Sequence, residues 1–324
     1  MIVAGASVAG AAHRDAGRGG EDAFRAVRTG HGAVLAVADG VGSRPRAALG
    51  AHLAVDTACR VLAAVPPPGR DAGAPEWTAW TAERGAFLAG RCSRWARALT
   101  GNEDGEPDDL AAALLVAFLR PPWVAFVSLG DCFAAVLTRA NGRDGGSGSD
   151  DRGGSRSPDA TDTPDGTDSP ESLTAPTVPN DSDREDNSDR KDVPGRTATP
   201  VERCHLVLPP PEPGGPPPAY TTSPSARLRV RTFTVWEPEL SGVVLATDGC
   251  APLALDHPSV RGLPDAAGPL PSPRFLPPLA AALRRGGGSA EPLHAVLSGT
   301  AAAERTGDDL TLLCALTEGD GRWG

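Results

Sequence analysis

The sequence predicts a mixed α+β fold in which strands and helices are grouped and do not alternate strictly. Three strand-sized apolar runs come first, two helical patterns follow them, and three more strand-sized runs come next. Apolar residues make up 40 % of the 324-residue chain, which is enough for a globular core. The 39 glycines and 33 prolines also require long irregular segments.

The first half of the chain opens with short apolar runs bounded by Gly, Arg or Asp, a pattern typical of strands. Ser43 and Pro45 supply an N-cap and a first-turn proline, and apolar residues then recur at helical spacing. Arg120-Pro121-Pro122 separates two apolar runs and predicts a hairpin. The expected strands are 3–8, 23–27, 33–38, 111–119, 123–129 and 133–138, and the expected helices are 48–63 and 76–99.

The second helix should bury Trp80, Phe87, Leu88, Cys92, Trp95 and Leu99, whereas Trp77 and Trp80 are also candidates for a surface position. In the second half of the chain, the same criteria predict strands and two helices but no internal repeat. The expected strands are 204–208, 228–235, 243–247 and 310–316, and the expected helices are 274–285 and 291–303.

A long acidic segment separates the two halves. Residues 141–200 hold 14 acidic and 7 basic residues, no aromatic residue and only six small or aliphatic apolar ones. Such a segment buries too little apolar surface to offset the entropy of ordering, so it is expected to be disordered. The Pro-rich run 209–218 extends this irregular region.

Charge and hydropathy exclude several classes of protein. The formal charge is −10, and because residues 141–200 carry −7, the remainder carries only −3. No basic stripe is present, so nucleic-acid binding is not expected. The longest apolar run, 110–119, is too short to span a bilayer, and the first residues lack the charged start of a secretory signal. The six scattered cysteines suggest reduced, buried thiols, so we expect a cytoplasmic protein.

Acidic residues recur at the ends of the apolar runs. Each one alone is most simply a turn or a solvated strand end. Five of them in one chain favour a cluster that holds Mg²⁺ or Mn²⁺, since carboxylates gathered without a metal would repel one another. The five features are Glu21-Asp22, Asp39-Gly40, Gly130-Asp131, Asp248-Gly249 and Asp308-Asp309.

In their order along the chain, these motifs resemble those of the metal-dependent protein phosphatases of type 2C, the PPM family, and in particular its bacterial subgroup, in which a His-Arg pair precedes the first acidic motif. The resemblance covers residues 1–139 and 201–317. The matching segments are His13-Arg14 with Gly20-Glu21-Asp22, Val37-Ala38-Asp39-Gly40, Ser128-Leu129-Gly130-Asp131, Ala246-Thr247-Asp248-Gly249 and Gly307-Asp308-Asp309-Leu310-Thr311.

The resemblance implies an α-β-β-α sandwich of two antiparallel sheets flanked by helices, with metals in a cleft at one end. Ligands from both sides of the acidic segment must then meet. The implied organisation is a single domain at 1–317, interrupted by a disordered insert at 141–218 and followed by a tail at 318–324. The implied catalytic residues are Asp39, Asp248 and Asp308, and the implied metal ligands are Glu21, Asp22, Asp39, the Gly40 carbonyl, Asp131, Asp248 and Asp308.

In this interpretation Asp39 bridges two Mn²⁺ or Mg²⁺ ions, Asp248 and Asp308 hold one of them, and Asp131 serves a weaker third ion. Many family members have a phosphate-binding arginine at the position of Gly17, so Arg14 and Arg18 are the candidates here. Some have a histidine at the position of Val41, so no general acid is assigned, and His13 is as good a structural residue as an acid.

The function implied is metal-dependent hydrolysis of phosphoserine and phosphothreonine in proteins by a metal-activated water, opposing bacterial Ser/Thr kinases. A monomer that binds neither nucleic acid nor membranes is expected. The alternative is a weak or inactive phosphatase fold that binds a phosphoprotein or acts as a scaffold. A third hypothesis, a sensor built around the acidic insert, rests on composition alone.

Overall fold

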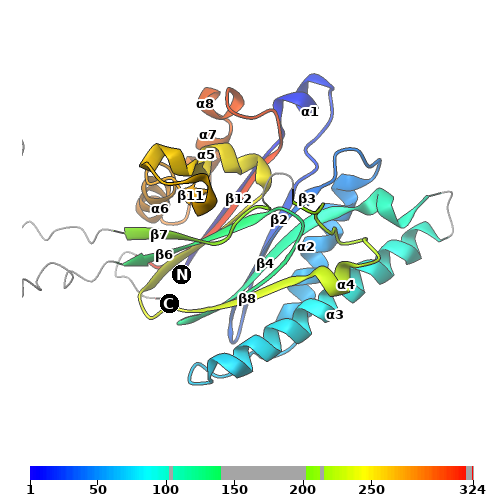
Figure 1. Cartoon of the computed structure of the whole chain (residues 1–324), viewed down its shortest axis with the longest axis horizontal. Coiled ribbons are helices and arrows are strands. Elements are labelled where there is room, and N and C mark those ends of the chain that lie inside the picture. The colour runs from blue at the N-terminus through cyan, green and yellow to red at the C-terminus, as the bar shows by residue number, and fades with distance from the viewer. Residues whose placement is uncertain (102–104, 140–201, 212–214, 319–322, 324) are drawn as a thin grey trace, which may run out of the picture. The chain divides into compact units, whose positions relative to one another are not determined.

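The computed structural model describes residues 1–101, 105–139, 202–211, 215–318 and 323. Its centre is a pair of five-stranded sheets in which every neighbouring pair of strands is antiparallel (Figure 1). The first sheet has the order β1 (Ile2–Val8), β12 (Leu310–Leu316), β9 (Leu240–Ala246), β6 (Phe133–Arg139) and β7 (Glu202–Leu208). The second has the order β2 (Ala23–Thr29), β3 (Gly32–Gly40), β4 (Ala112–Arg120), β5 (Trp123–Leu129) and β8 (Arg231–Trp236).

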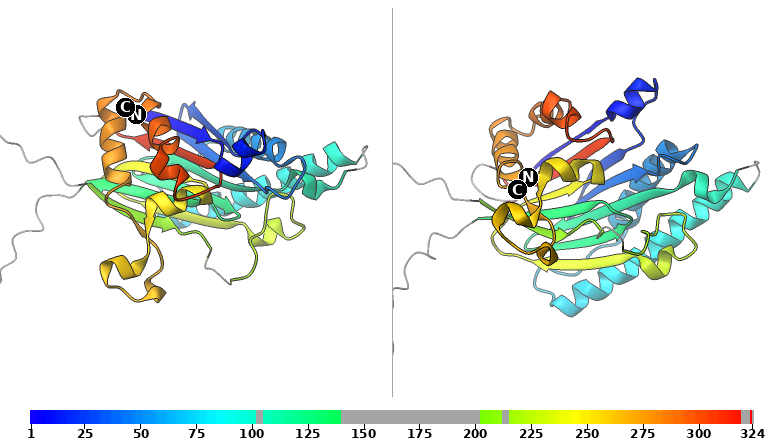
Figure 2. Two further views of the ribbon diagram at one scale, coloured as in Figure 1. Left: turned by 90° about the horizontal axis from the view of Figure 1, so that it is seen from above. Right: turned by 45° about the horizontal axis from the view of Figure 1, so that its top comes forward.

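Helices cover the outer face of each sheet (Figure 2). Two long helices, α2 (Ala47–Ala63) and α3 (Ala74–Thr100), pack on the second sheet, and α6 (Leu276–Arg285) and α7 (Glu291–Leu297) pack on the first. The remaining elements are short: α1 (Ala11–Asp15), η1 (Pro107–Leu110), α4 (Ala226–Arg229), η2 (Asp248–Cys250), α5 (Ala251–Ala254), β10 (Leu255–Asp256), η3 (Pro258–Arg261), η4 (Asp265–Ala267), β11 (Leu270–Pro271) and α8 (Thr300–Ala303). No described helix combines the length and apolar character needed to cross a membrane.

The central strands are buried on both faces, which explains why their sequences read as continuous apolar runs. Leu35, Phe126 and Leu245 belong to the layer between the sheets, and each is fully buried. Their neighbours in sequence turn toward the helices instead. The α-β-β-α sandwich that the resemblance implied is therefore confirmed.

Both halves of the chain contribute to each sheet. In the first sheet, β1 pairs with β12, and β6 pairs with both β9 and β7. In the second sheet, β5 pairs with β8. Residues 1–140 and 201–324 accordingly form one compact unit. Residues 141–201 of the predicted insert lie outside the described residues. The predicted extension of the insert to 218 needs correction, because residues 202–208 form β7, whose pairing with β6 satisfies the backbone.

Several predicted boundaries were wrong for local reasons. The N-cap predicted at Ser43 is wrong: Arg46 precedes the first residue of α2, Ala47, because a turn comes first, in which the Arg46 N–H donates to the Asp109 carbonyl. A short helix, α4, occupies the start of the strand predicted at 228–235. The helix predicted at 291–303 is split at Gly299 into α7 and α8.

The buried side of α3 also differs from the prediction. Trp77, a candidate for the surface, is fully buried, and its ring stacks on Trp123 with 5.4 Å between centroids. Phe87 and Leu99, expected to be buried, are 47 % and 40 % exposed. The buried stripe runs through residues at spacings of three and four from Trp77 to Cys92, so Trp77 sets the register of the helix.

All six cysteines are free thiols, as predicted, and all but Cys204 are buried. Burial raises the pKa of the Cys59 and Cys92 thiols to about 12. Neither forms a thiolate near neutral pH, so neither is suited to nucleophilic chemistry.

Candidate metal centre

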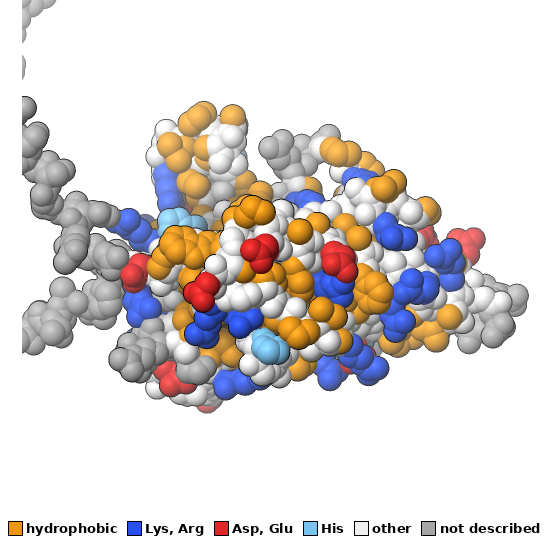
Figure 3. All heavy atoms as spheres, turned by 90° about the horizontal axis from the view of Figure 1, so that it is seen from below, with side chains coloured by type: hydrophobic (Ala, Val, Ile, Leu, Met, Phe, Trp, Pro, Cys, Tyr) orange, Lys and Arg blue, Asp and Glu red, His pale blue; other side chains and the backbone are white. Residues whose placement is uncertain are grey.

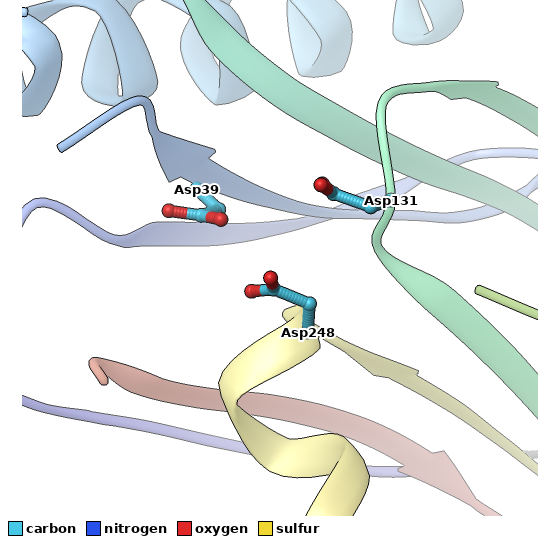
Figure 4. A group of neighbouring side chains, drawn as sticks. All are labelled: Asp39, Asp131 and Asp248. Carbon is cyan, nitrogen blue, oxygen red and sulfur yellow. The ribbon is translucent and has the colours of Figure 1, made fainter. Parts of the chain in front are cut away.

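Three carboxylates from different strand ends converge on one point. Asp39 lies at the end of β3, Asp131 in the turn between β5 and β6, and Asp248 just after β9. One oxygen from each lies within 4.8 Å of the other two. Figure 4 shows the three side chains directed into a common space. Two full negative charges at this separation repel by about 3 kcal/mol at an effective dielectric constant of about 20, a repulsion that a divalent cation would remove.

The proximity of these groups changes their acidity. Burial, followed by the charges of Asp22, Asp248 and Asp131, raises the pKa of Asp39 far above its ordinary value. Burial and the charge of Asp248 raise the pKa of Asp131 to about 6. Burial also raises the pKa of Asp22, although a hydrogen bond from the Thr247 hydroxyl (2.8 Å) opposes it. The site therefore holds more negative charge than its surroundings stabilise.

Unpartnered oxygens show whether the residues fit a cation. In the described part of the chain, Glu21 Oε2, Asp22 Oδ1 and Asp131 Oδ1 are buried and accept no hydrogen bond. A buried carboxylate oxygen without a donor is costly unless a cation pairs with it. Hard oxygen donors of this kind suit Mn²⁺ and Mg²⁺. The donor set thus fits the divalent ions that the sequence analysis predicted.

Two glycines allow the backbone segments to meet here. A Cβ on Gly40 would lie 2.8 Å from the Glu21 carbonyl oxygen, and the Gly40 N–H donates to that same oxygen at 3.2 Å. A Cβ on Gly249 would lie 2.0 Å from the Asp309 carbonyl oxygen. Any side chain at either position would separate the segments that carry Asp39, Glu21 and Asp248.

The closing motif contributes two acids with different surroundings. Asp308 is exposed and is not one of the three acids whose oxygens lie within 4.8 Å of one another. Its Cβ is nevertheless close to Gly249, because a Cβ on that glycine would lie 3.3 Å from it. Asp309 is buried, and it accepts hydrogen bonds from the N–H groups of Gly10 (2.7 Å) and Glu21 (2.5 Å). The roles assigned to Asp308 and the other ligands stay predictions.

Asp309 was not assigned a role from the sequence. It lies 2.8 Å from His13 Nδ1, which donates to the carboxylate, and His13 Nε2 faces Glu21 Oε1 at 3.7 Å. Asp309 thereby joins α1, the Glu21 segment and the start of β12. The available signal was its place one residue before a buried strand, where alternate side chains turn inward.

The two candidate phosphate-binding arginines are placed differently. The Arg14 guanidinium donates to the Ala9 carbonyl, whereas Arg18 is 54 % exposed with Nη1 3.5 Å from Glu21 Oε1. Position 17 has φ +66°, and the Gly17 N–H donates to the Arg14 carbonyl where α1 ends. An arginine is disfavoured in this left-handed conformation, which explains the glycine at this position.

A second missed residue supports the Asp131 turn. Arg231, at the start of β8, donates from Nη2 to Ser128 Oγ (3.0 Å) and to the Gly130 carbonyl (3.2 Å). Burial lowers the pKa of this guanidinium. Gly130 has φ +92°, and a Cβ there would lie 2.4 Å from Ala113 Cβ. The sequence places Arg231 and Ser128 about a hundred residues apart, and only the pairing of β5 with β8 brings them together.

Comparisons with known proteins agree with this geometry. Residues 9–151 match the family model of protein phosphatase 2C. The matched residues include the first three acidic features, Glu21-Asp22, Asp39-Gly40 and Gly130-Asp131. The second half of the chain supplies the other two, which contain Asp248 and Asp308. No curated protein matches the chain by sequence.

Solved structures extend the comparison over both halves. The serine/threonine phosphatase Stp1 from Staphylococcus aureus is 13 % identical, with 98 % of this chain and 96 % of that chain covered and a TM-score of 0.51. A bacterial serine phosphatase is 12 % identical, with 99 % of each chain covered and a TM-score of 0.51. A bacterial serine phosphatase that carries a single arginine-to-lysine substitution gives a TM-score of 0.53 at the same identity and coverage.

These similarities establish the fold of the described residues in both halves of the chain. The family model covers the part of the chain that holds Asp39 and Asp131, and the second half brings Asp248 to the same point. Together, the family model matched by residues 9–151, the shared fold and the converging carboxylates make the chain similar to the phosphatases of the protein phosphatase 2C family.

Proposed function

We propose that the protein is a Mn²⁺- or Mg²⁺-dependent phosphatase that hydrolyses phosphoserine and phosphothreonine in proteins and so opposes Ser/Thr kinases. The observation that carries the proposal is the approach of Asp39, Asp131 and Asp248 within 4.8 Å in a phosphatase fold. Three acids from separate strand ends have no structural reason to face one another. A metal site that hydrolyses phosphate esters would explain why these three acids face one another.

The residues around this point suit the binding of two or three ions. In our proposal Asp39, Asp131 and Asp248 hold them, and Glu21, Asp22, Asp308 and the Gly40 carbonyl complete the ligand set. Bound divalent ions would lower the pKa of a water molecule and neutralise charge on the phosphoryl oxygens.

The chain itself supplies orientation and charge. Asp309 accepts a hydrogen bond from the Glu21 N–H, and His13 Nε2 lies 3.7 Å from Glu21 Oε1, while Glu21 Oε2 is buried without a partner. Arg18 stands beside that carboxylate, half exposed, where its guanidinium can bind two oxygens of an incoming phosphate. Arg14 is held by the Ala9 carbonyl, which makes Arg18 the better candidate.

The experiment is hydrolysis of a phosphothreonine peptide with Mn²⁺, with EDTA, and by Asp39→Asn and Asp248→Asn. We expect activity that requires Mn²⁺ and falls by roughly two orders of magnitude or more in each variant. Asp265→Asn is the matched control, because Asp265 is 87 % exposed and lies outside the cluster. Folded protein that neither binds Mn²⁺ nor hydrolyses the peptide would overturn the proposal.

A further inference from the structure

A groove lies beside the end of α3, away from the carboxylate cluster. It has a volume of about 760 Å³ and lies between α3, η1 and the segment that leads into α4. This space accommodates several amino-acid side chains. The residues that line it include Arg94, Arg97, Glu106, Asp108, Thr222 and Arg227.

Three arginines give the groove an excess of positive charge. A Cβ placed on Gly90 would lie 3.7 Å from Arg227 Nε and 3.8 Å from Arg94 Nη1, so two guanidinium groups flank one point. Arg97 donates from Nε to the Ser93 carbonyl. Among the described residues, no carboxylate forms an ion pair with any of these three arginines.

The two acids in the groove are already engaged. The Glu106 side chain accepts a hydrogen bond from the backbone at the start of η1. Asp108 accepts a hydrogen bond from the Thr222 hydroxyl (3.0 Å) and faces Arg44 at 3.5 Å. Leu228 of α4, the neighbour of Arg227 in sequence, is 90 % exposed. In Figure 3, arginine side chains (blue) gather at the right-hand end of the face shown.

The η1 segment that borders the groove leads directly into β4, which pairs with the strand that carries Asp39. The Val41 N–H donates to the Ala111 carbonyl, and Asp39 is the cross-strand partner of Ala113. Asp108, on the groove, is therefore only a few residues from the strand position opposite Asp39.

We propose that this groove binds an acidic segment of the phosphoprotein substrate. The proposal rests on the proposed function for the identity of the occupant. Carboxylates of the segment would pair with Arg94 and Arg227, whose charges otherwise repel each other. The groove thus selects substrates whose phosphorylated residue is followed or preceded by acidic residues.

The first test measures binding without catalysis. A fluorescein-labelled, unphosphorylated peptide rich in Asp and Glu is titrated with full-length protein at low and at physiological salt, beside an Asn/Gln analogue. We expect the acidic peptide to bind about tenfold more tightly than the analogue, and the Arg94→Glu/Arg227→Glu variant to lose this difference. Arg285→Glu, an exposed arginine on α6, is the matched control. Equal binding by the double variant, or tighter binding of a DNA oligonucleotide than of the peptide, would overturn the proposal.

The second test uses turnover. The double variant should lower kcat/KM for an acidic phosphothreonine peptide about tenfold, mostly through KM, and leave p-nitrophenyl phosphate hydrolysis unchanged. An unchanged kcat/KM would contradict substrate selection by the groove. Absence of turnover on both substrates, with peptide binding intact, would instead refute the proposed function and leave the groove's specificity for acidic peptides standing.

Discussion

Asp309 Oδ1 accepts a hydrogen bond of 2.7 Å from the backbone N–H of Gly10, 299 residues earlier in the chain. The same carboxylate accepts bonds from the Glu21 N–H and from His13 Nδ1. The first and last acidic motifs are thus fastened by one buried side chain. The neighbouring Asp308 faces outward, so two adjacent acids differ in their surroundings.

Replacing Asp309 with Ala should destabilise the protein by about 3 kcal/mol, because three donors lose their acceptor in a buried place. It should also weaken Mn²⁺ binding, since Glu21 would no longer be held. Urea denaturation and calorimetric Mn²⁺ titration measure the two effects. Asp265→Ala should change neither, because Asp265 is exposed. Unchanged stability in Asp309→Ala would show that these bonds do not hold the motifs together.

Gly130→Ala should cost about 3 kcal/mol or more. The residue has φ +92°, and the added methyl group would meet Ala113 Cβ at 2.4 Å. Because the clash pushes the Asp131 turn outward, metal affinity should fall as well. Gly30→Ala is the control, since nothing lies within 4 Å of a Cβ there and its φ is not in the left-handed region. Comparable urea midpoints for the two variants would contradict the argument.

Metal-free protein should lose stability as pH rises. The pKa of Asp131 is about 6 in the folded protein against an ordinary value of 3.8, so the folded state binds more protons over that interval. Stability therefore falls between about pH 4 and pH 6 through Asp131, and the raised pKa values of Asp22 and Asp39 extend this fall above pH 6. At about pH 8 in EDTA, Asp131→Asn should raise the Tm by about 2–6 °C, measured by calorimetry. A Tm that does not depend on pH, or a lower Tm in Asp131→Asn, would refute this electrostatic account.

Added Mn²⁺ should reverse this trend, because a cation offsets the repulsion that protons otherwise relieve. We expect Mn²⁺ to raise the Tm of wild-type protein more at about pH 8 than at about pH 5. The rise should be small in Asp39→Asn and in Asp248→Asn, since each lacks one carboxylate of the cluster. An equal increase in Tm for wild type and both variants would show that Mn²⁺ binds outside the carboxylate cluster.

The acidic segment should be dispensable for folding. Arg139 and Glu202 are cross-strand partners at the open ends of β6 and β7, so a short turn can join them. We propose that residues 1–317 form one domain that residues 141–200 merely interrupt. Replacing those residues with a short Gly-Asn turn should keep the circular dichroism spectrum and raise stability by about 2 kcal/mol through loop entropy. Loss of the folded spectrum would show that the segment is part of the domain.

Most strands were predictable because each is largely buried and reads as a continuous apolar run. Strand β12 was predicted at residues 310–316, as observed. The buried face of α3 was not predicted, because Trp77 is buried by stacking on Trp123, which is distant in the sequence. Helix α2 begins late for a similar reason, since Asp109 holds the preceding turn.

The same distinction applies to the site. The sequence by itself determined which acids stand at strand ends and in what order, because apolar runs and their boundaries are local features. Only the tertiary structure decided that Asp131 joins Asp39 and Asp248, that Asp309 turns inward, and that Arg231 supports the Asp131 turn. These facts depend on which strands pair and which ends coincide. Strand pairing joins residues as far apart as Ile2 and Leu316, and a local sequence pattern does not indicate which strands will pair.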